Sequence, residues 1–213
     1  MVIPRPRPLV VERIMRDDLV RARESSTVMC AQARFTLLSE RLIRLEWSGN
    51  GTFEDRVAAA FPQRIAPPTP FTIWHDATWL IINTGALTLR YQSDNRPFGS
   101  GNLLVSCTVD GQTRTWMPRS SPLEQLSRIS SPTDRAAGTN GVTHIEWLMA
   151  HTGWLVFDNS QSVVASNAEE AVEPRSDPRR QDWYFFGYGH DYRAVVSEYK
   201  HFGGSLLVAQ QQG

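Results

Sequence analysis

The sequence predicts an all-β fold, an antiparallel β-sandwich with one C-terminal helix. Short apolar or alternating runs follow one another along the 213 residues, and turn residues separate them at intervals of about 8–12 residues, a spacing typical of sandwiches. One segment near the C-terminus has the apolar spacing of a helix instead. No repeat of fixed period occurs, so a repeat architecture is not indicated.

The expected strands are runs rich in β-branched, aromatic and aliphatic residues. They cover residues 31–38, 42–47, 71–75, 78–83, 87–91, 103–109, 112–117, 142–149 and 153–157. The clearest alternation is LTLRY, which places Leu87, Leu89 and Tyr91 on one face of its strand. A strand with one buried and one exposed face is what a sandwich requires.

Four turns are expected between these strands. One is Asp76-Ala77, between 71–75 and 78–83. Residues 39–41 separate the first two strands. Asn50-Gly51 is the strongest hairpin signal, because both residue types tolerate a positive φ. Asp110-Gly111 is a second candidate for a type I′ turn, since apolar alternating runs flank it on both sides.

The chain divides into three parts on this reading. Residues 1–27 form an N-terminal extension, residues 28–190 the β-sandwich, and residues 191–213 a helix with the connection that follows it. Within the sandwich, residues 118–141 and 165–181 are polar and lack an apolar period, so both are expected to be loops.

The C-terminal helix is expected over residues 191–202, with Asp191 as its N-cap and Gly203 at the C′ position. Lys200 and His201 fall in the last turn, where the helix dipole favours cations. One apolar stripe follows the helical period and consists of Tyr192, Val195, Val196, Tyr199 and Phe202. A helix this short is marginal alone, so the stripe must pack against something.

Composition excludes several classes of protein. The chain has 22 basic and 22 acidic side chains, and this zero balance argues against nucleic acid as a partner. No apolar run reaches the roughly 18–20 residues that span a bilayer. The N-terminus lacks the apolar core of a signal peptide, which predicts a cytoplasmic protein with Cys30 and Cys107 as buried, reduced thiols.

Motifs for cofactors and metals are absent from the sequence. There is no phosphate loop, GxGxxG, CxxC, HExxH or GxSxG, and the five histidines have no metal-ligand spacing. We therefore predict no cofactor and no metal site. A Ser-His-Asp arrangement stays open, because such triads are spatial. No carboxylate stands in a context that marks it as catalytic, so no catalytic residue is predicted.

Seven tryptophans are many for a chain of this length. Their large apolar area favours the sandwich core for most of them. The alternative is a sugar-binding platform, because the C–H faces of pyranose rings stack on aromatic rings.

Three stretches carry a resemblance to a known family. They are RFTLLSERLIRLEWSGNGTFEDR at 34–56, GWLVFDNS at 153–160 and DWYFFGYGHDYRAVVSEYKHFGG at 182–204. In the same order, they resemble segments of the N-terminal domain of glycoside hydrolase family 31, the α-glucosidase and α-xylosidase family. Asn159 stands where that family usually has Asp.

The resemblance implies a galactose-mutarotase-like sandwich, which in the family precedes a (β/α)₈ barrel that carries both catalytic carboxylates. This sequence contains no such barrel. We therefore expect a non-catalytic N-terminal domain, a fragment whose missing partner is the catalytic barrel and which binds carbohydrate weakly or not at all without it. The 192/195/199 face of the helix should be poorly covered for the same reason.

The resemblance also suggests a substrate-binding residue. In the family a loop of this domain reaches the mouth of the barrel, and the segment QLSRISSPTD at 125–134 matches it by position. Leu126 and Asp134 are the residues it keeps, so Asp134 is the candidate for contact with sugar.

Two other functions remain open. A stand-alone carbohydrate-binding module would need a row of exposed aromatic side chains. A mutarotase-like enzyme would need a histidine and a carboxylate that converge in a concave sheet as acid and base.

Overall fold

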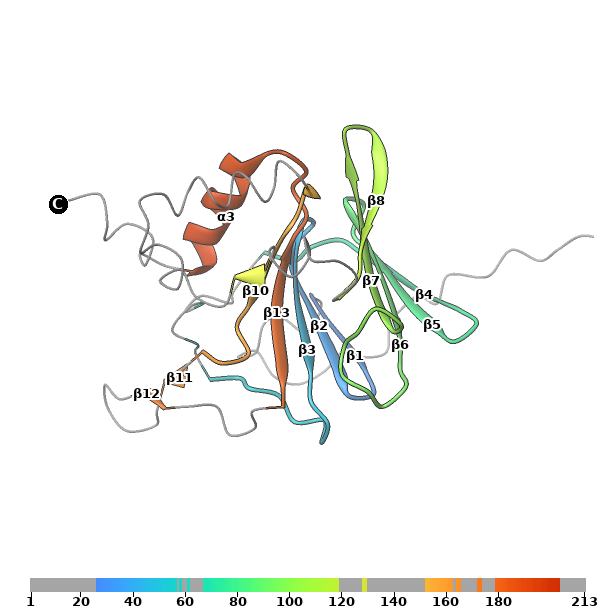
Figure 1. The fold of residues 1–213 in the computed structure, drawn as a ribbon, viewed down its shortest axis with the longest axis vertical. Coiled ribbons are helices and arrows are strands. Elements are labelled where there is room, and N and C mark those ends of the chain that lie inside the picture. Colours follow the sequence, from blue (N-terminus) through green and yellow to red (C-terminus); the bar gives the residue numbers. More distant parts are fainter. Residues whose placement is uncertain are drawn as a thin grey trace, which may run out of the picture.

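The protein is a three-layered β-sandwich in the computed structural model (Figure 1). The structure describes residues 26–56, 58, 61, 67–118, 128–129, 152–162, 164–165, 172–173 and 179–203. Within these residues a five-stranded sheet packs on one face of a six-stranded sheet, and helix α3 covers part of the other face. The predicted all-β sandwich with a C-terminal helix is confirmed.

The six-stranded sheet has the order β1-β2-β3-β13-β10-β9. Its strands are β1 Thr27–Cys30, β2 Ala33–Ser39, β3 Leu42–Trp47, β13 Gln181–Phe186, β10 Leu155–Asp158 and β9 Arg128–Ile129. Neighbours are antiparallel except β9, which runs parallel to β10. Strand β13 lies beside β3, so an early and a late part of the chain share the middle of this sheet.

The five-stranded sheet is an antiparallel meander in sequence order. Its strands are β4 Thr72–Asp76, β5 Trp79–Asn83, β6 Leu87–Gln92, β7 Leu103–Val109 and β8 Gln112–Trp116. Asp110 and Gly111 join β7 to β8 with φ angles of 52° and 75°, as the predicted type I′ turn requires.

The main core lies between the two sheets. Alternate residues of each strand point into it, and Leu87, Leu89 and Tyr91 are buried as the alternation in β6 predicts. Aromatic rings from both sheets meet there: Phe35 contacts Tyr91 edge-on, and Trp116 contacts Trp183 edge-on, with centroid distances of 5.3 and 6.1 Å. Aromatic pairs stabilise a core beyond the apolar area that they bury, and they prefer particular ring geometries. These contacts therefore help to set how the two sheets pack on each other.

A second core lies under α3, on the outer face of the six-stranded sheet. Helix α3 spans Tyr192–Gly203, and Asp191 caps it by accepting a hydrogen bond from the Ala194 amide at 3.0 Å. The buried side chains that meet there are Leu38, Leu42, Phe61, Leu155, Phe157, Tyr184, Phe186, Val195, Tyr199 and Phe202. The expectation of a poorly covered helix face is therefore wrong for Val195 and Tyr199, because the sheet itself receives the stripe; Tyr192 alone is exposed.

Several local predictions are also corrected. Asn50-Gly51 forms a turn, with Gly51 at φ 70°, but no strand follows it, so the predicted hairpin is wrong. Asn50 explains the difference, since its side-chain oxygen accepts hydrogen bonds from Ser48 and Thr52 and holds a compact turn that sends the chain across the sheet.

The two polar segments contain short strands where loops were predicted. Strand β9 lies within 118–141, and the two-stranded ribbon of β11 Val164–Ala165 and β12 Val172–Glu173 begins just before 165–181 and ends within it. Two-residue strands are too short to leave a periodic signal. The strand predicted over 142–149 lies outside the described residues.

Candidate functional site

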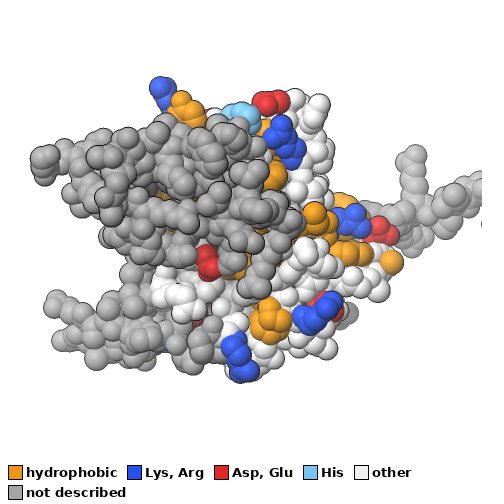
Figure 2. Space-filling model, viewed as in Figure 1, with side chains coloured by type: hydrophobic (Ala, Val, Ile, Leu, Met, Phe, Trp, Pro, Cys, Tyr) orange, Lys and Arg blue, Asp and Glu red, His pale blue; other side chains and the backbone are white. Residues whose placement is uncertain are grey.

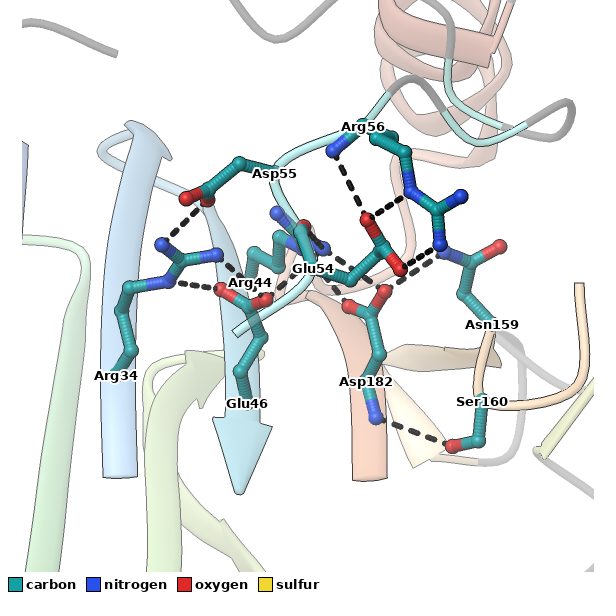
Figure 3. Close-up of polar contacts among 9 residues, drawn as sticks. All are labelled: Arg34, Arg44, Glu46, Glu54, Asp55, Arg56, Asn159, Ser160 and Asp182. Atoms are coloured by element: carbon teal, nitrogen blue, oxygen red, sulfur yellow. Dashed lines mark hydrogen bonds and ion pairs between the residues drawn. The ribbon is translucent and has the colours of Figure 1, made fainter. Parts of the chain in front are cut away.

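Charged side chains form a buried cluster on the outer face of the six-stranded sheet, beside the area that α3 covers (Figure 3). The strand register creates it. Arg34 of β2 lies opposite Glu46 of β3, and Glu46 lies opposite Asp182 of β13. Arg44 lies one row further along β3, opposite Tyr184. Two arginines and two carboxylates are thereby placed on three adjacent strands.

Both arginines bind carboxylates at two points. Arg34 donates from Nε and Nη2 to the two Glu46 oxygens at 2.6 and 2.9 Å, and from Nη1 to Asp55 at 2.6 Å. Arg44 donates from Nε and Nη2 to the two Asp182 oxygens at 2.8 and 2.9 Å. Its Nη2 also lies 2.9 Å from Glu46 Oε1, so Arg44 links the two carboxylates.

The segment after β3 closes over this cluster. Arg44 reaches the Glu54 carbonyl at 3.5 Å, and the Glu54 carboxylate accepts hydrogen bonds from Arg56 Nε and Nη2, both at 2.8 Å. Glu54 is 6% exposed. The segment FEDR, from Phe53 to Arg56, thus covers the arginines of the sheet with two carboxylates and one guanidinium and is called the FEDR lid below.

Residues beyond β10 complete the cluster from the other side. Asn159 Nδ2 donates to Asp182 Oδ2 at 2.8 Å, and its backbone amide donates to the Asp182 carbonyl at 2.8 Å. The Asp182 amide donates in turn to Ser160 Oγ at 3.0 Å. Asn159 is fully buried, and its Oδ1 has no hydrogen-bond partner among the described residues.

The electrostatics of the cluster hold its arginines charged. Burial lowers the pKa of the Arg44 guanidinium, but attraction from Asp182 and Glu46 outweighs it and leaves the pKa well above its usual range. The pKa of Arg34 is also raised, because the hydrogen bond and charge of Glu46 outweigh its burial. Glu46 and Asp182 are each 2% exposed and bound by guanidinium groups, so neither can reach a substrate.

Tyr184 joins the charged cluster to the apolar core under α3. Its ring centroid lies 5.7 Å from Arg44 Cζ, and the ring stacks on Phe61 with centroids 3.6 Å apart and planes 7° apart. The cluster is therefore continuous with the packing of the helix, and it fixes strands, lid and helix to one another.

The sequence predicts one substrate-binding residue. Asp134 lies outside the described residues. Among the parts that are described, no group of three or more His, Cys, Asp or Glu side chains is arranged to hold a metal ion. His190 Nε2 lies 3.8 Å from Asp110 Oδ2, but both side chains are exposed beside a hairpin turn rather than in a concave sheet. This pair does not offer the geometry of a mutarotase.

Two tryptophans were not singled out in the sequence and form a separate surface. Trp47, Trp116, Trp154 and Trp183 are buried in the main core, as expected for most of the seven. Trp74 and Trp79 are only half-buried and lie together on the outer face of the five-stranded sheet. The alternation within WLIIN at 79–83 could have indicated that Trp79 faces away from the core, because Trp79 is out of phase with the buried Leu80 and Ile82.

Comparison with protein-family models and with curated proteins finds no match for this chain. None of the helices in the described part of the chain has the length and apolar character needed to cross a membrane.

Proposed function

We propose that this chain is the non-catalytic, galactose-mutarotase-like N-terminal domain of a glycoside hydrolase similar to family 31. The complete enzyme would hydrolyse α-glycosidic bonds in carbohydrate metabolism. The sandwich would act as the support on which a (β/α)₈ barrel is built, and the barrel would supply the catalytic carboxylates.

One observation carries this proposal: the three stretches that resemble the family converge in the charged cluster. Arg44 comes from the first stretch, Asn159 from the second and Asp182 from the third, and both Arg44 and Asn159 donate hydrogen bonds to Asp182. Residues from three stretches that are far apart in sequence thus form one buried unit, in which Asn159 occupies the position where the family usually has Asp. A resemblance made of unrelated local patterns would give no reason for this convergence.

The chemistry of the cluster supports a role without catalysis. Retaining glycosidases need two carboxyl groups about 5–5.5 Å apart that flank the scissile bond, one of which acts as a nucleophile. Both carboxylates are instead buried. Glu46 is bound by Arg34 and Arg44, and Asp182 by Arg44 and Asn159. Their geometry suits the anchoring of strands and of the FEDR lid.

The proposal is tested by reading the genomic frame that follows codon 213 and by assaying its product. We expect the frame to encode a (β/α)₈ barrel with an aspartate at a strand end, and the product to hydrolyse p-nitrophenyl α-glucoside or α-xyloside with retention. Residues 1–213 alone should show no turnover. A frame that closes or encodes another fold would contradict the proposal, as would steady turnover by residues 1–213.

The second candidate function is a stand-alone carbohydrate-binding module. Among the described residues the exposed aromatic side chain is Tyr192, so the row of exposed aromatics expected for such a module is not seen there. Trp74 and Trp79 still favour it, because they are half-buried and share one face of the five-stranded sheet with hydroxyl and amide side chains. That surface can bind a ligand whether or not a barrel follows.

A further inference from the structure

We propose that the outer face of the five-stranded sheet binds a neutral oligosaccharide, with Trp74 and Trp79 as stacking surfaces and Arg90 as a hydrogen-bond donor. The inference does not depend on the proposed hydrolase. In the described part of the chain, α3 covers the six-stranded sheet, and no element packs on the outer side of β4–β8 (Figure 1).

The strand register sorts this face into parallel rows. One row, called the apolar row because Arg90 is its one polar member, crosses four strands in the order Trp74, Ile81, Arg90 and Leu104. Beside it a row of hydroxyl and amide side chains crosses five strands in the order Thr72, Asn83, Thr88, Ser106 and Thr115. On the other side of the apolar row lie Asp76, Trp79 and Gln92.

Trp74 and Trp79 are diagonal neighbours on this face. Trp79 lies opposite Asp76, two residues from Trp74 on β4. Diagonal neighbours on adjacent strands are about 7–8 Å apart, which is within reach for aromatic side chains. The two indoles therefore share one face of the sheet with polar groups, the combination that pyranose rings need for stacking and hydrogen bonding.

Arg90 is positioned between the two sides of the face. Its Cζ lies 5.3 Å from the Trp79 ring centroid, a cation–π contact that orients both groups. Its Nη2 lies 3.9 Å from Asp76 Oδ2, which is too long for a hydrogen bond. With about 43% of its side chain exposed, Arg90 keeps donors at this end available for the oxygen atoms of a ligand.

Hydrogen bonds within the polar row preorganise its groups. Asn83 Nδ2 donates to Thr88 Oγ1 at 2.8 Å, and the Ser106 and Thr115 hydroxyls are 2.8 Å apart. On the other side of the apolar row, Gln92 Nε2 donates to Thr78 Oγ1 at 2.9 Å. Each hydroxyl keeps further acceptor capacity, so a sugar hydroxyl can join without displacing these bonds.

The balance of charged side chains on this face indicates which chemical class of ligand it can bind. Arg90 and Asp76 are its charged side chains and have opposite signs. On the side of the molecule seen in Figure 2, the Lys, Arg, Asp and Glu side chains that are described are scattered with both signs interspersed. Nucleic acids and anionic membranes need a basic surface, and this face does not provide one. A neutral, hydroxyl-rich ligand fits it.

A second copy of the chain fits the face less well. Interfaces between identical subunits are about 65% apolar. Here apolar side chains occupy one row, while hydroxyl and amide groups occupy the next. An oligosaccharide meets both rows, because each pyranose has an apolar face and a polar rim.

Isothermal titration calorimetry of residues 1–213 with maltohexaose, xylohexaose and cellohexaose tests the proposal. We expect at least one of them to bind with a Kd of about 0.1–1 mM. The double variant Trp74→Ala/Trp79→Ala should weaken that binding at least about tenfold. Tyr192→Ala removes an exposed aromatic ring from α3 and serves as the matched control, with unchanged affinity expected.

An NMR titration of the unaltered protein tests the proposal even if the double variant fails to fold. Amide NMR shifts of the unaltered protein, titrated with the same sugar, should change in β4–β7 and stay constant in α3. The proposal is overturned if none of the three sugars binds at about 10 mM, or if the shifts map to another surface. It is also overturned if sedimentation shows a dimer that the double variant dissociates, because a second copy would then occupy this face.

Discussion

Arg44 and Asp182 form a two-point ion pair across β3 and β13, at 2.8 and 2.9 Å, although 138 positions separate them in the sequence. Both side chains are at most 3% exposed. The pair therefore ties the middle of the six-stranded sheet together in a region that excludes water.

Replacing Arg44 should be strongly destabilising. Arg44→Met leaves Glu46 and Asp182 buried without the cation between them, which typically costs about 3–5 kcal/mol. The free energy of unfolding in urea measures this. Glu40→Gln is the control, because it removes one side of the exposed contact between Arg41 and Glu40 and should change stability by less than about 0.5 kcal/mol. An Arg44→Met variant as stable as the control would contradict the buried pair.

Asn159→Asp should destabilise the protein in a pH-dependent way. The new carboxylate would lie beside Asp182, and the donor that now bonds Asp182 Oδ2 at 2.8 Å would be lost. Repulsion between the two carboxylates would raise the pKa of the new group, so the loss of about 2–4 kcal/mol at pH 7 should shrink as the pH falls towards 5. Unfolding at both pH values measures it. A variant as stable as the parent at pH 7 would show that a cation is available at this position.

Gly153→Ala tests a close approach between the sheets. Gly153 has a φ of 82°, and an added Cβ would lie 2.4 Å from Val109 Cγ2. Gly51→Ala is the matched control, because Gly51 has a φ of 70° and open space around its Cβ position. The control should cost about 1–2 kcal/mol from backbone strain alone. Gly153→Ala should cost at least about 2 kcal/mol more, measured by thermal unfolding. Equal losses of stability in the two variants would mean that the Val109 side chain moves aside without an energetic cost.

The buried tyrosines should limit stability at alkaline pH. Burial raises the pKa of Tyr199 from about 10 to about 12, and burial together with the nearby Cys30 does the same for Tyr91. Because the unfolded chain ionises first, the stability from keeping each phenol neutral is present below pH 10 and lost between pH 10 and 12. A shift of this size corresponds to roughly 2–3 kcal/mol per tyrosine at most.

Tyr199→Phe isolates one of these tyrosines. The Tyr199 hydroxyl is buried without a hydrogen-bond partner among the described residues, so its removal should stabilise the protein by up to about 1 kcal/mol at pH 8. The fall in the free energy of unfolding from pH 9 to 12 should become smaller in this variant. An identical fall in both proteins would mean that Tyr199 is already exposed to solvent.

Structural features that depend on residues close together in the sequence could be predicted from it. The alternation of β6, the turn at Asp110-Gly111 and the cap at Asp191 depend on near neighbours, and the structure has each of them as expected. The hairpin predicted at Asn50-Gly51 is wrong, because the same residue types also suit a turn held by its own side-chain hydrogen bonds.

Features that depend on distant contacts could not be read from the sequence. The apolar stripe of α3 packs against residues that are as far apart in sequence as Leu38 and Phe186. The charged cluster needs the register between β3 and β13, which no local pattern determines. Trp74 and Trp79 share one face because of the register between β4 and β5. The sequence does not tell which face of that sheet packs on the main core; the structure shows that it is the face opposite to the two tryptophans.

The placement of β13 beside β3 has a consequence for how the protein is made. Residues near position 45 leave the ribosome well over a hundred residues before their partners in β13, at a rate of about 5–20 residues per second. Until then β3 is the unpaired edge of the β1–β3 meander, and its inner face carries the apolar side chains of Ile43 and Leu45. Closing so long a loop is slow, which makes the nascent chain vulnerable to pairing with other strands. Arg44 and Glu46 then have a further use: the two charges on the unpaired edge strand β3 disfavour pairing with an incorrect strand until Asp182 is available.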